Sequence, residues 1–314
     1  MFDGLGRILI RQHLRSALAI LALGTLAGCG AAPPQVAPLE APTLPPEPTA
    51  TPFVVPPTST TALPVAASPT SVPLPTATAV PTVAAPSVRV VPPDPETGVS
   101  QMYEKGTSGR MEIALTFDAG ADRGNGEAIL DRLAAYEVPA SFGVTGQWAE
   151  ANPDLIQRMV ADGHNVFNHS WSHSSWTGRS TSADPEDPST WTPLPYEARL
   201  EELHRTEQVI REIANYEVRP YYRPPYGDID SESLEVLAEA GYHATVMWSC
   251  ESFAWKGWTA AQIVSYCTTN MAPGDIILLH VGAQGADYDA LPGLIEGLRA
   301  QGFAFVTIEQ ILQP

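Results

Sequence analysis

Positive charge is scarce in this chain. Its 314 residues include 17 lysines and arginines against 35 aspartates and glutamates, which gives a formal net charge of −18. Most of the excess lies beyond residue 98, where 13 basic residues stand against 30 acidic ones. Nucleic acids and anionic membrane surfaces repel such a domain, so the composition argues against both as substrates. We expect no nucleic-acid partner.

The N-terminal region also lacks a hydrophobic run long enough for a permanent membrane helix. Its apolar segment covers 17–26, whereas a span needs about 20 apolar residues. Arginines precede this segment and Leu-Ala-Gly-Cys closes it at 26–29, a pattern typical of a signal peptide over 1–28. The tetrapeptide resembles a bacterial lipoprotein box, which implies an exported protein attached to the membrane only through lipid on Cys29, facing the cell surface or periplasm. An ordinary secretory signal or a plain anchor helix is the alternative.

Charged and aromatic residues are nearly absent between residues 30 and 97. Phe53 is the one aromatic residue there, and 19 of the 31 prolines lie between residues 31 and 100. A stretch of this composition cannot bury enough apolar surface to offset its chain entropy. We expect 29–105 to be a disordered linker, rich in Pro, Ala and Thr, that holds a folded domain at 106–314 away from the membrane.

Cysteine is rare, with 3 residues in the whole chain. If Cys29 carries lipid, Cys250 and Cys267 are the remaining thiols of an exported protein. An oxidising compartment favours a disulfide between them. Two buried free thiols, or a pair too far apart to close, are the alternative.

Strand-like and helix-like segments alternate through 106–314. Apolar runs typical of strands lie at 112–117, 140–144, 164–168, 219–222, 242–248, 275–280 and 303–306. Helical patterns lie at 126–136, 152–162, 196–215, 231–240, 259–270, 291–301 and 307–312. Such alternation predicts parallel strands with helical crossovers. The number of strand–helix units favours a barrel with slightly fewer than eight of them, although alternation alone does not exclude an open doubly wound sheet.

Polar residues follow several of these strands. They are Asp118 after the first, His169 and His173 after the third, Arg223 and Tyr226 after the fourth and His280 at the end of the sixth. The carboxyl ends of barrel strands open on one face, where active sites form. The spacing of His169 and His173 lets two imidazoles reach one metal from a single helical turn. Singly, each residue is more often a cap, an ion pair or a core histidine; together they predict one pocket.

The folded part resembles the polysaccharide deacetylase family, carbohydrate esterase family 4 with the NodB homology domain. The resemblance covers about 110–312 and rests on four motifs in matching order: TFDAG at 116–120, HSWSH at 169–173, RPPYG at 223–227 and LLHVG at 278–282. It implies an α/β fold, a distorted (β/α)7 barrel of the NodB type. It also implies a divalent metal, usually zinc, and removal of N-acetyl groups from amino-sugar polymers such as peptidoglycan or chitin-like glycans.

The resemblance also implies roles for single residues. Asp118 is the general base, oriented by Arg223, and His280 is the general acid that protonates the departing amine. The binding roles fall on His169 and His173 for the metal, the backbone N–H of Tyr226 for the oxyanion, Leu279 for the acetyl methyl group and Trp255 for the sugar.

Two positions depart from the family pattern. The family commonly has a second, metal-binding acid after the base, where this chain has Ala119. Either Asp118 itself or Asp122 on the same loop is then the third ligand. The second departure lies in the segment WSCESFAW at 248–255. The family usually has acids there before the tryptophan, and this chain has Glu251 and Ala254. Only Glu251 keeps a charge that can pair with Arg223.

Several functions stay open at this point. The leading one is a monomeric, metal-dependent N-deacetylase with a polysaccharide substrate. An O-acetyl glycan esterase would need the same base and oxyanion site, and a sugar-binding module that has lost its metal is a third reading. A glycosidase using Asp118 and Asp122 would leave the paired histidines unexplained. Retention of Asp118, Arg223 and His280 argues against the binding module, which needs neither an acid nor a base.

Overall fold

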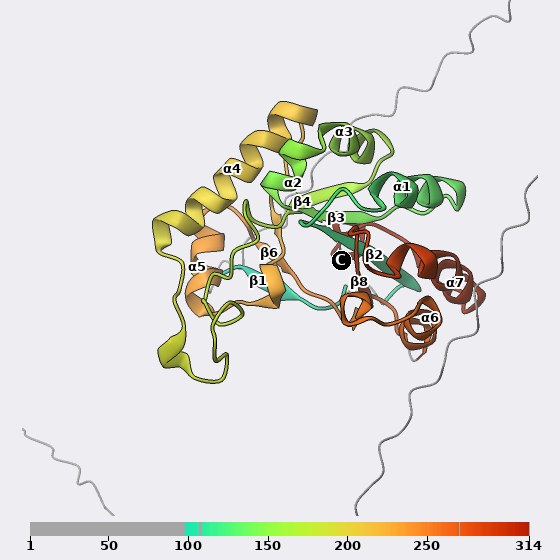
Figure 1. Cartoon of the computed structure of the whole chain (residues 1–314). Coiled ribbons are helices and arrows are strands. Elements are labelled where there is room, and N and C mark those ends of the chain that lie inside the picture. Colours follow the sequence, from blue (N-terminus) through green and yellow to red (C-terminus); the bar gives the residue numbers. More distant parts are fainter. Residues whose placement is uncertain (1–97, 107–108, 270, 314) are drawn as a thin grey trace, which may run out of the picture. The chain divides into compact units, whose positions relative to one another are not determined.

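The computed structural model describes residues 98–106, 109–269 and 271–313, and Figure 1 shows their arrangement. The predicted signal peptide (1–28), the lipidation site Cys29 and the linker up to residue 97 lie outside the described residues. The boundary expected at 105/106 falls too late, because residues 101–103 already form a strand of the sheet. No helix in the described part is long and apolar enough to cross a lipid bilayer.

Parallel strands form one curled sheet. The strands are β1 (Gln101–Tyr103), β2 (Glu112–Ala119), β3 (Ser141–Val144), β4 (Asn165–Asn168), β5 (Tyr221–Tyr222), β6 (Ala244–Val246), β7 (Cys250–Glu251), β8 (Ile276–His280) and β9 (Ala304–Phe305). Their order is β1-β6-β5-β4-β3-β2-β8-β7, and β9 pairs with the start of β2. The two edge strands, β1 and β7, do not pair with each other in the described part of the chain, so no ladder between them closes the barrel.

Helices connect the strands and surround the sheet, as Figure 1 shows. They are α1 (Gly126–Ala135), α2 (Gly146–Ala151), α3 (Pro153–Ala161), α4 (Tyr196–Ala214), α5 (Ser231–Glu239), α6 (Ala260–Thr268), α7 (Asp287–Ala300) and α8 (Ile308–Ile311). The arrangement confirms the distorted (β/α)7 barrel and rules out the doubly wound sheet, in which helices cover both faces.

The core has two parts, one on each face of the sheet. Leu115 and Phe117 of β2 belong to the larger cluster, which also contains the apolar faces of the surrounding helices. Ala114 of the same strand belongs to a smaller cluster with Ile276 of β8 and Ile308 of α8. Because successive strand residues point to opposite faces, β2 supplies both clusters alternately. The smaller cluster is the interior of the barrel.

Helix α7 begins earlier than its sequence suggests. The pattern predicted a start at 291, whereas the helix begins at Asp287 and contains Pro292. Proline lacks the N–H that would bond the carbonyl four residues earlier. That carbonyl, on Tyr288, instead accepts a hydrogen bond from Arg132 Nη1 at 3.4 Å. A contact from another helix therefore replaces the bond that Pro292 removes.

A disulfide joins Cys250 to Cys267, with Cα atoms 6.0 Å apart. Cys250 lies in β7, a strand the sequence analysis did not anticipate, and Cys267 lies in α6. The bridge therefore ties a two-residue edge strand to the helix that follows it. It also holds the segment that carries Glu251 and Trp255 beside the mouth of the barrel.

Candidate active site

A cavity of about 960 Å³ opens where the barrel strands end. Its lining includes the polar residues that the sequence places after separate strands, namely Asp118, His169, His173, Tyr226 and His280. The parallel topology therefore brings them together on one face, as expected for the carboxyl ends of barrel strands.

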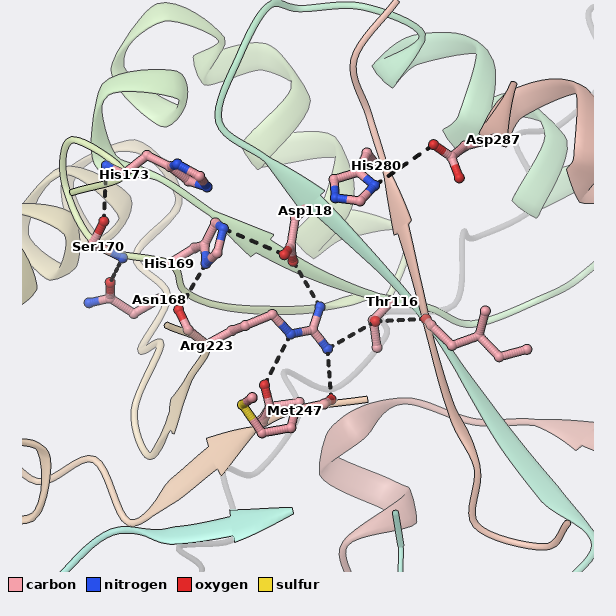
Figure 2. A network of polar contacts seen from close by, with 12 residues as sticks. Thr116, Asp118, Asn168, His169, Ser170, His173, Arg223, Met247, His280 and Asp287 are labelled. Carbon is pink, nitrogen blue, oxygen red and sulfur yellow. Dashed lines mark hydrogen bonds and ion pairs between the residues drawn. The ribbon is translucent and has the colours of Figure 1, made fainter. Parts of the chain in front are cut away.

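Arg223 lies beneath this cavity and holds Asp118 in place (Figure 2). Its side chain is fully buried, and Nη1 donates a hydrogen bond of 2.8 Å to Asp118 Oδ1. Nε donates to the Val246 carbonyl at 3.0 Å, and Nη2 donates to Thr116 Oγ1 at 3.0 Å. A buried guanidinium with this many partners cannot move without losing hydrogen bonds. It therefore fixes the position of the carboxylate.

Asp118 is ionised at neutral pH although it is nearly buried. Burial alone would raise the pKa of its carboxyl group, but the positive charge of Arg223 and its hydrogen bond bring that pKa below its ordinary value. The carboxylate also needs the space left by Gly143 on β3, where a Cβ would lie 2.7 Å from Asp118 Oδ1. The site therefore contains an anchored carboxylate that is able to accept a proton.

His169 presents an unprotonated nitrogen to Asp118. Its Nδ1 lies 2.8 Å from the Arg223 carbonyl oxygen, which only accepts hydrogen bonds, so the proton is on Nδ1. The lone pair of Nε2 then faces Asp118 Oδ2 across 3.5 Å. Burial is the largest cause that lowers the pKa of His169, so the imidazole is neutral at pH 7. A neutral, oriented imidazole of this kind is suited to bind a metal ion.

His173 reaches the same region from a loop. The expected helical turn is absent between residues 169 and 173, because Ser170 and His173 have left-handed φ angles of 68° and 61°. The His173 backbone N–H donates to Ser170 Oγ at 3.0 Å, and its ring centroid lies 4.9 Å from that of His169. Burial, followed by the neighbouring His169, lowers the pKa of His173 to about 4. Both rings are therefore neutral in the pH range where a metal site operates.

The donor set fits a divalent cation beside His169 and Asp118. Two atoms with lone pairs, Nε2 and Oδ2, face each other across 3.5 Å, and two ligands of a tetrahedral zinc lie about 3.4 Å apart. The other candidate ligand, Asp122, is already engaged, since its Oδ1 accepts a hydrogen bond from the Ala283 backbone at 3.1 Å. Ala119 is buried in the apolar cluster under the helices. Among the residues that the structure describes, no three His, Cys, Asp or Glu side chains converge on one point.

His280 is the register partner of Asp118 on the neighbouring strand β8. Its ring is partly exposed to the cavity, and Nδ1 lies 3.9 Å from Oδ2 of Asp287 at the start of α7. Sequence reasoning missed Asp287, because an acid in the first turn of a helix is an ordinary start signal. Figure 2 shows the His280 ring between Asp118 and Asp287.

The assignment of Leu279 to the acetyl methyl group is wrong. Leu279 is fully buried in the cluster between the sheet and the helices, whereas Leu278 lines the cavity. The reason is the two-residue period of a strand, which places Leu278 and His280 on one face of β8 and Leu279 on the other. Of the two leucines, Leu278 is therefore the one that shares the cavity with His280.

The segment before α6 forms one wall of the cavity. Trp255 is 63% exposed and lines the cavity, and Lys256 Nζ lies 4.6 Å from the centre of its ring. Trp255 Nε1 donates to Glu251 Oε1 at 2.6 Å. Glu251 therefore orients Trp255 and does not pair with Arg223, whose acidic partner is Asp118.

Tyr226 contributes a backbone group as well as a ring. Its φ angle of 61° turns the chain after two prolines, and its ring packs edge-on against His173 at 4.6 Å. Within the described chain its backbone N–H has no hydrogen-bond acceptor, whereas the next two N–H groups bond to Pro224 and Pro225. An unused N–H at the cavity is suited to an oxyanion.

Comparison with known proteins agrees with this geometry. The family model for polysaccharide deacetylases matches residues 105–245. A peptidoglycan-N-acetylglucosamine deacetylase of Bacillus cereus is 32% identical over 66% of this chain and 70% of that protein. The peptidoglycan-N-acetylmuramic acid deacetylase PdaA of Bacillus subtilis is 30% identical over 72% of this chain and 83% of that protein.

A solved structure is similar over nearly all of its length. It is a peptidoglycan N-acetylglucosamine deacetylase in complex with 4-naphthalen-1-yl-N-oxidanyl-benzamide, with a TM-score of 0.59 and 29% identity, and the match covers 68% of this chain and 92% of that one. The barrel, the order of the motifs and the relatives agree. The chain belongs to the polysaccharide deacetylase family, the hydrolases of carbohydrate esterase family 4.

Proposed function

We propose that this chain is a divalent-metal-dependent N-deacetylase that acts on an amino-sugar polymer of the bacterial cell wall. One observation carries the proposal: the ionised carboxylate of Asp118, anchored by buried Arg223, lies beside His280 on the neighbouring strand and opposite His169. A sugar-binding module needs no such acid–base pair. The peptidoglycan deacetylases among the relatives support the choice of substrate class.

The proposed reaction begins with water attack on the acetyl carbonyl. Asp118 accepts a proton from the attacking water, and its low pKa ensures that it is ionised beforehand. The Tyr226 backbone N–H donates a hydrogen bond to the carbonyl oxygen as negative charge develops there. The methyl group rests near Leu278, the apolar residue of β8 that lines the cavity.

The second half of the reaction releases the amine. The carbon–nitrogen bond breaks while His280 donates a proton to the leaving nitrogen, because an unprotonated amine anion is far too basic to depart. The products are acetate and a free amino group on the sugar. We assign metal binding to His169 and His173 with Asp118 beside them, and a divalent cation there would polarise the carbonyl and the water. Zinc is the cation we propose.

We further propose export and attachment through lipid on Cys29, with 29–97 as a spacer between the membrane and the barrel. The disulfide between Cys250 and Cys267 supports an oxidising compartment. The relatives that act on peptidoglycan support a location at the cell envelope. Metabolic labelling with a radioactive fatty acid tests the anchor, since labelling should disappear in Cys29→Ser.

The central experiment compares acetate release from three substrates. Purified protein is loaded with zinc and incubated with peptidoglycan, with chito-oligomers and with O-acetylated xylan. Release from an N-acetylated glycan, abolished in Asp118→Asn, supports the proposal. Release from xylan alone would replace it with an O-acetyl esterase, and sugar binding with no release from any substrate would replace it with a binding module.

A further inference from the structure

Asp287 is a buried acid whose carboxylate has no hydrogen-bond partner of regular geometry. The residue is 1% exposed, and both of its carboxylate oxygens lack such a partner. The same is true of His280 Nδ1, which lies 3.9 Å from Asp287 Oδ2. Buried polar atoms without partners are unfavourable, so two such groups facing each other point to a contact completed in another state of the site.

The surrounding chain leaves room for this acid. A Cβ at Gly285 would lie 3.0 Å from Asp287 Oδ2 and 3.1 Å from the Ala254 Cβ. Asp287 and Ala254 therefore border the same space, although they come from α7 and from the segment after β7. In the family pattern an acid is usual in the segment where this chain has Ala254. In this chain the carboxylate that lies near His280 is that of Asp287, which comes from α7 and not from the segment after β7.

Some of the surrounding groups stabilise negative charge at this place against the effect of burial. Asp287 is the first residue of α7, where the helix dipole favours negative charge. Burial, together with the charge of Glu251, raises the pKa of Asp287 above its ordinary value, and the nearby Ser252 hydroxyl and the charge and backbone of His280 offset part of that rise. The charge of His280 is thus among the influences that favour the ionised form of Asp287.

We propose that Asp287 is the positioning residue of the general acid. It accepts a hydrogen bond from Nδ1–H of His280, which holds the ring so that the other nitrogen, Nε2, carries its proton towards the leaving amine. In the step itself the carbon–nitrogen bond breaks, the proton passes from Nε2 to the nitrogen, and the Nδ1 proton stays on the ring beside Asp287. The inference rests on the proposed function.

The separation of 3.9 Å is longer than a hydrogen bond, so the inference requires the two groups to approach each other in the substrate complex. Catalytic hydrogen bonds are often long in the free enzyme and tighten when substrate binds. A merely structural role, in which Asp287 only stabilises the start of α7, is the competing explanation. The two explanations differ in which reactions they affect.

The experiment compares two substrates that differ in the leaving group. An N-acetylated chito-oligomer releases an amine that must be protonated, whereas 4-nitrophenyl acetate releases a phenolate that needs no proton. In Asp287→Asn we expect kcat on the oligomer to fall about 10-fold to 100-fold with little change in KM, while hydrolysis of the ester stays within about twofold. Asp287→Glu should recover part of the loss. Asp289→Asn, an exposed acid in the same helical turn, is the matched control and should behave like wild type.

A second comparison places the effect on His280. If Asp287 acts through that ring, adding Asp287→Asn to His280→Ala should lower kcat on the oligomer no further than His280→Ala alone. An equal loss on both substrates, or an additive loss in the double variant, would overturn the inference in favour of a structural role. Wild-type kcat in Asp287→Asn would overturn it outright. Failure of wild type itself to release acetate from any N-acetylated glycan is a different result, which rejects the proposed function.

Discussion

Asp118 and His280 occupy paired positions on the neighbouring parallel strands β2 and β8. Paired residues of a parallel sheet point to the same face, so the proposed base and the proposed acid meet although the motifs that contain them lie far apart in the chain. Arg223, from a third strand end, bonds the base at 2.8 Å. Three segments therefore fix the relative position of two proton-transfer groups.

The first prediction concerns this pair. Asp118→Asn preserves the shape of the side chain and removes the base, so kcat should fall at least about a hundredfold while sugar binding is retained. His280→Ala should lower kcat by a similar factor. Acetate release and calorimetric binding of a chito-oligomer measure the two quantities separately. Near-wild-type kcat in both variants would refute the assignment of the acid and the base.

The second prediction concerns the metal. Zinc bound per chain, measured by elemental analysis after dialysis, should fall strongly in His169→Ala and in His173→Ala because each removes a neutral imidazole from the site. A chelator should abolish acetate release, and added zinc should restore it. The control is His164→Gln, which alters a histidine buried elsewhere that accepts a hydrogen bond from the Ala140 backbone. Unchanged zinc content in His169→Ala would exclude the proposed site.

The third prediction concerns the space around the base. In Gly143→Ala the new Cβ would lie 2.7 Å from Asp118 Oδ1 and 2.7 Å from the Phe167 ring, so the carboxylate, the ring or both must shift from their present positions. We expect kcat to fall at least about tenfold, since small misplacements of catalytic groups are costly. Gly297→Ala on α7, where the new Cβ meets the Thr268 methyl group at 3.1 Å and no residue of the cavity lining, is the control. Equal activity of the two variants would contradict this account.

The fourth prediction concerns acid stability in the metal-free protein. Burial lowers the pKa of His173 and of His164 to about 4, below the ordinary 6.5. Between pH 6.5 and 4 the unfolded chain therefore binds protons that the folded chain does not, and the free energy of unfolding should decrease as the pH falls through that window. The lowered pKa of Asp118 acts at still lower pH, where its protonation removes the ion pair with Arg223.

Urea unfolding at pH 7, 6, 5 and 4 measures this dependence. His173→Gln should flatten the decrease between pH 6.5 and 4, because one of the groups responsible is gone. A stability that stays constant through this window in the wild-type protein would contradict the neutral state of the two buried histidines.

The fifth prediction concerns the disulfide. Cys250 and Cys267 close a loop with a sequence separation of 17, for which the loss of the bridge costs about 3 kcal/mol. Reduction, or the double change of both cysteines to serine, should therefore lower the free energy of unfolding by about that amount. Because the bridge holds the segment with Trp255, KM should rise more than kcat falls. Unchanged stability after reduction would show that the bridge does not constrain the unfolded chain.

Much of the site could be predicted from the sequence because its polar residues directly follow or close the apolar runs that form the strands. An apolar run followed at once by Asp118, or closed by His280, indicates a polar group at the edge of a parallel sheet. The separate motifs then share a face by topology alone. For this reason the convergence of Asp118, His169, Arg223 and His280 was predictable without coordinates, whereas the choice of a barrel over an open sheet rested on the family resemblance.

Other features required the tertiary structure. Side chains of β8 alternate between the two faces of the sheet, so only one of Leu278 and Leu279 faces the cavity. The structure shows that it is Leu278, and the sequence does not, because both residues are leucine. Strand β1 has no apolar signal of its own and exists because β6 offers a free edge. The early start of α7 depends on Arg132, which bonds the carbonyl that Pro292 cannot.

The charge state of the site was likewise decided only by packing. The sequence by itself predicted that Asp118, His169, His173 and His280 share one pocket, and after which strands they come. It did not determine that Arg223 bonds Asp118 and leaves Glu251 to Trp255, nor that Asp287 faces His280. Pairing among buried charges depends on distances of a few ångströms between segments remote in the chain, and only the folded barrel sets those distances.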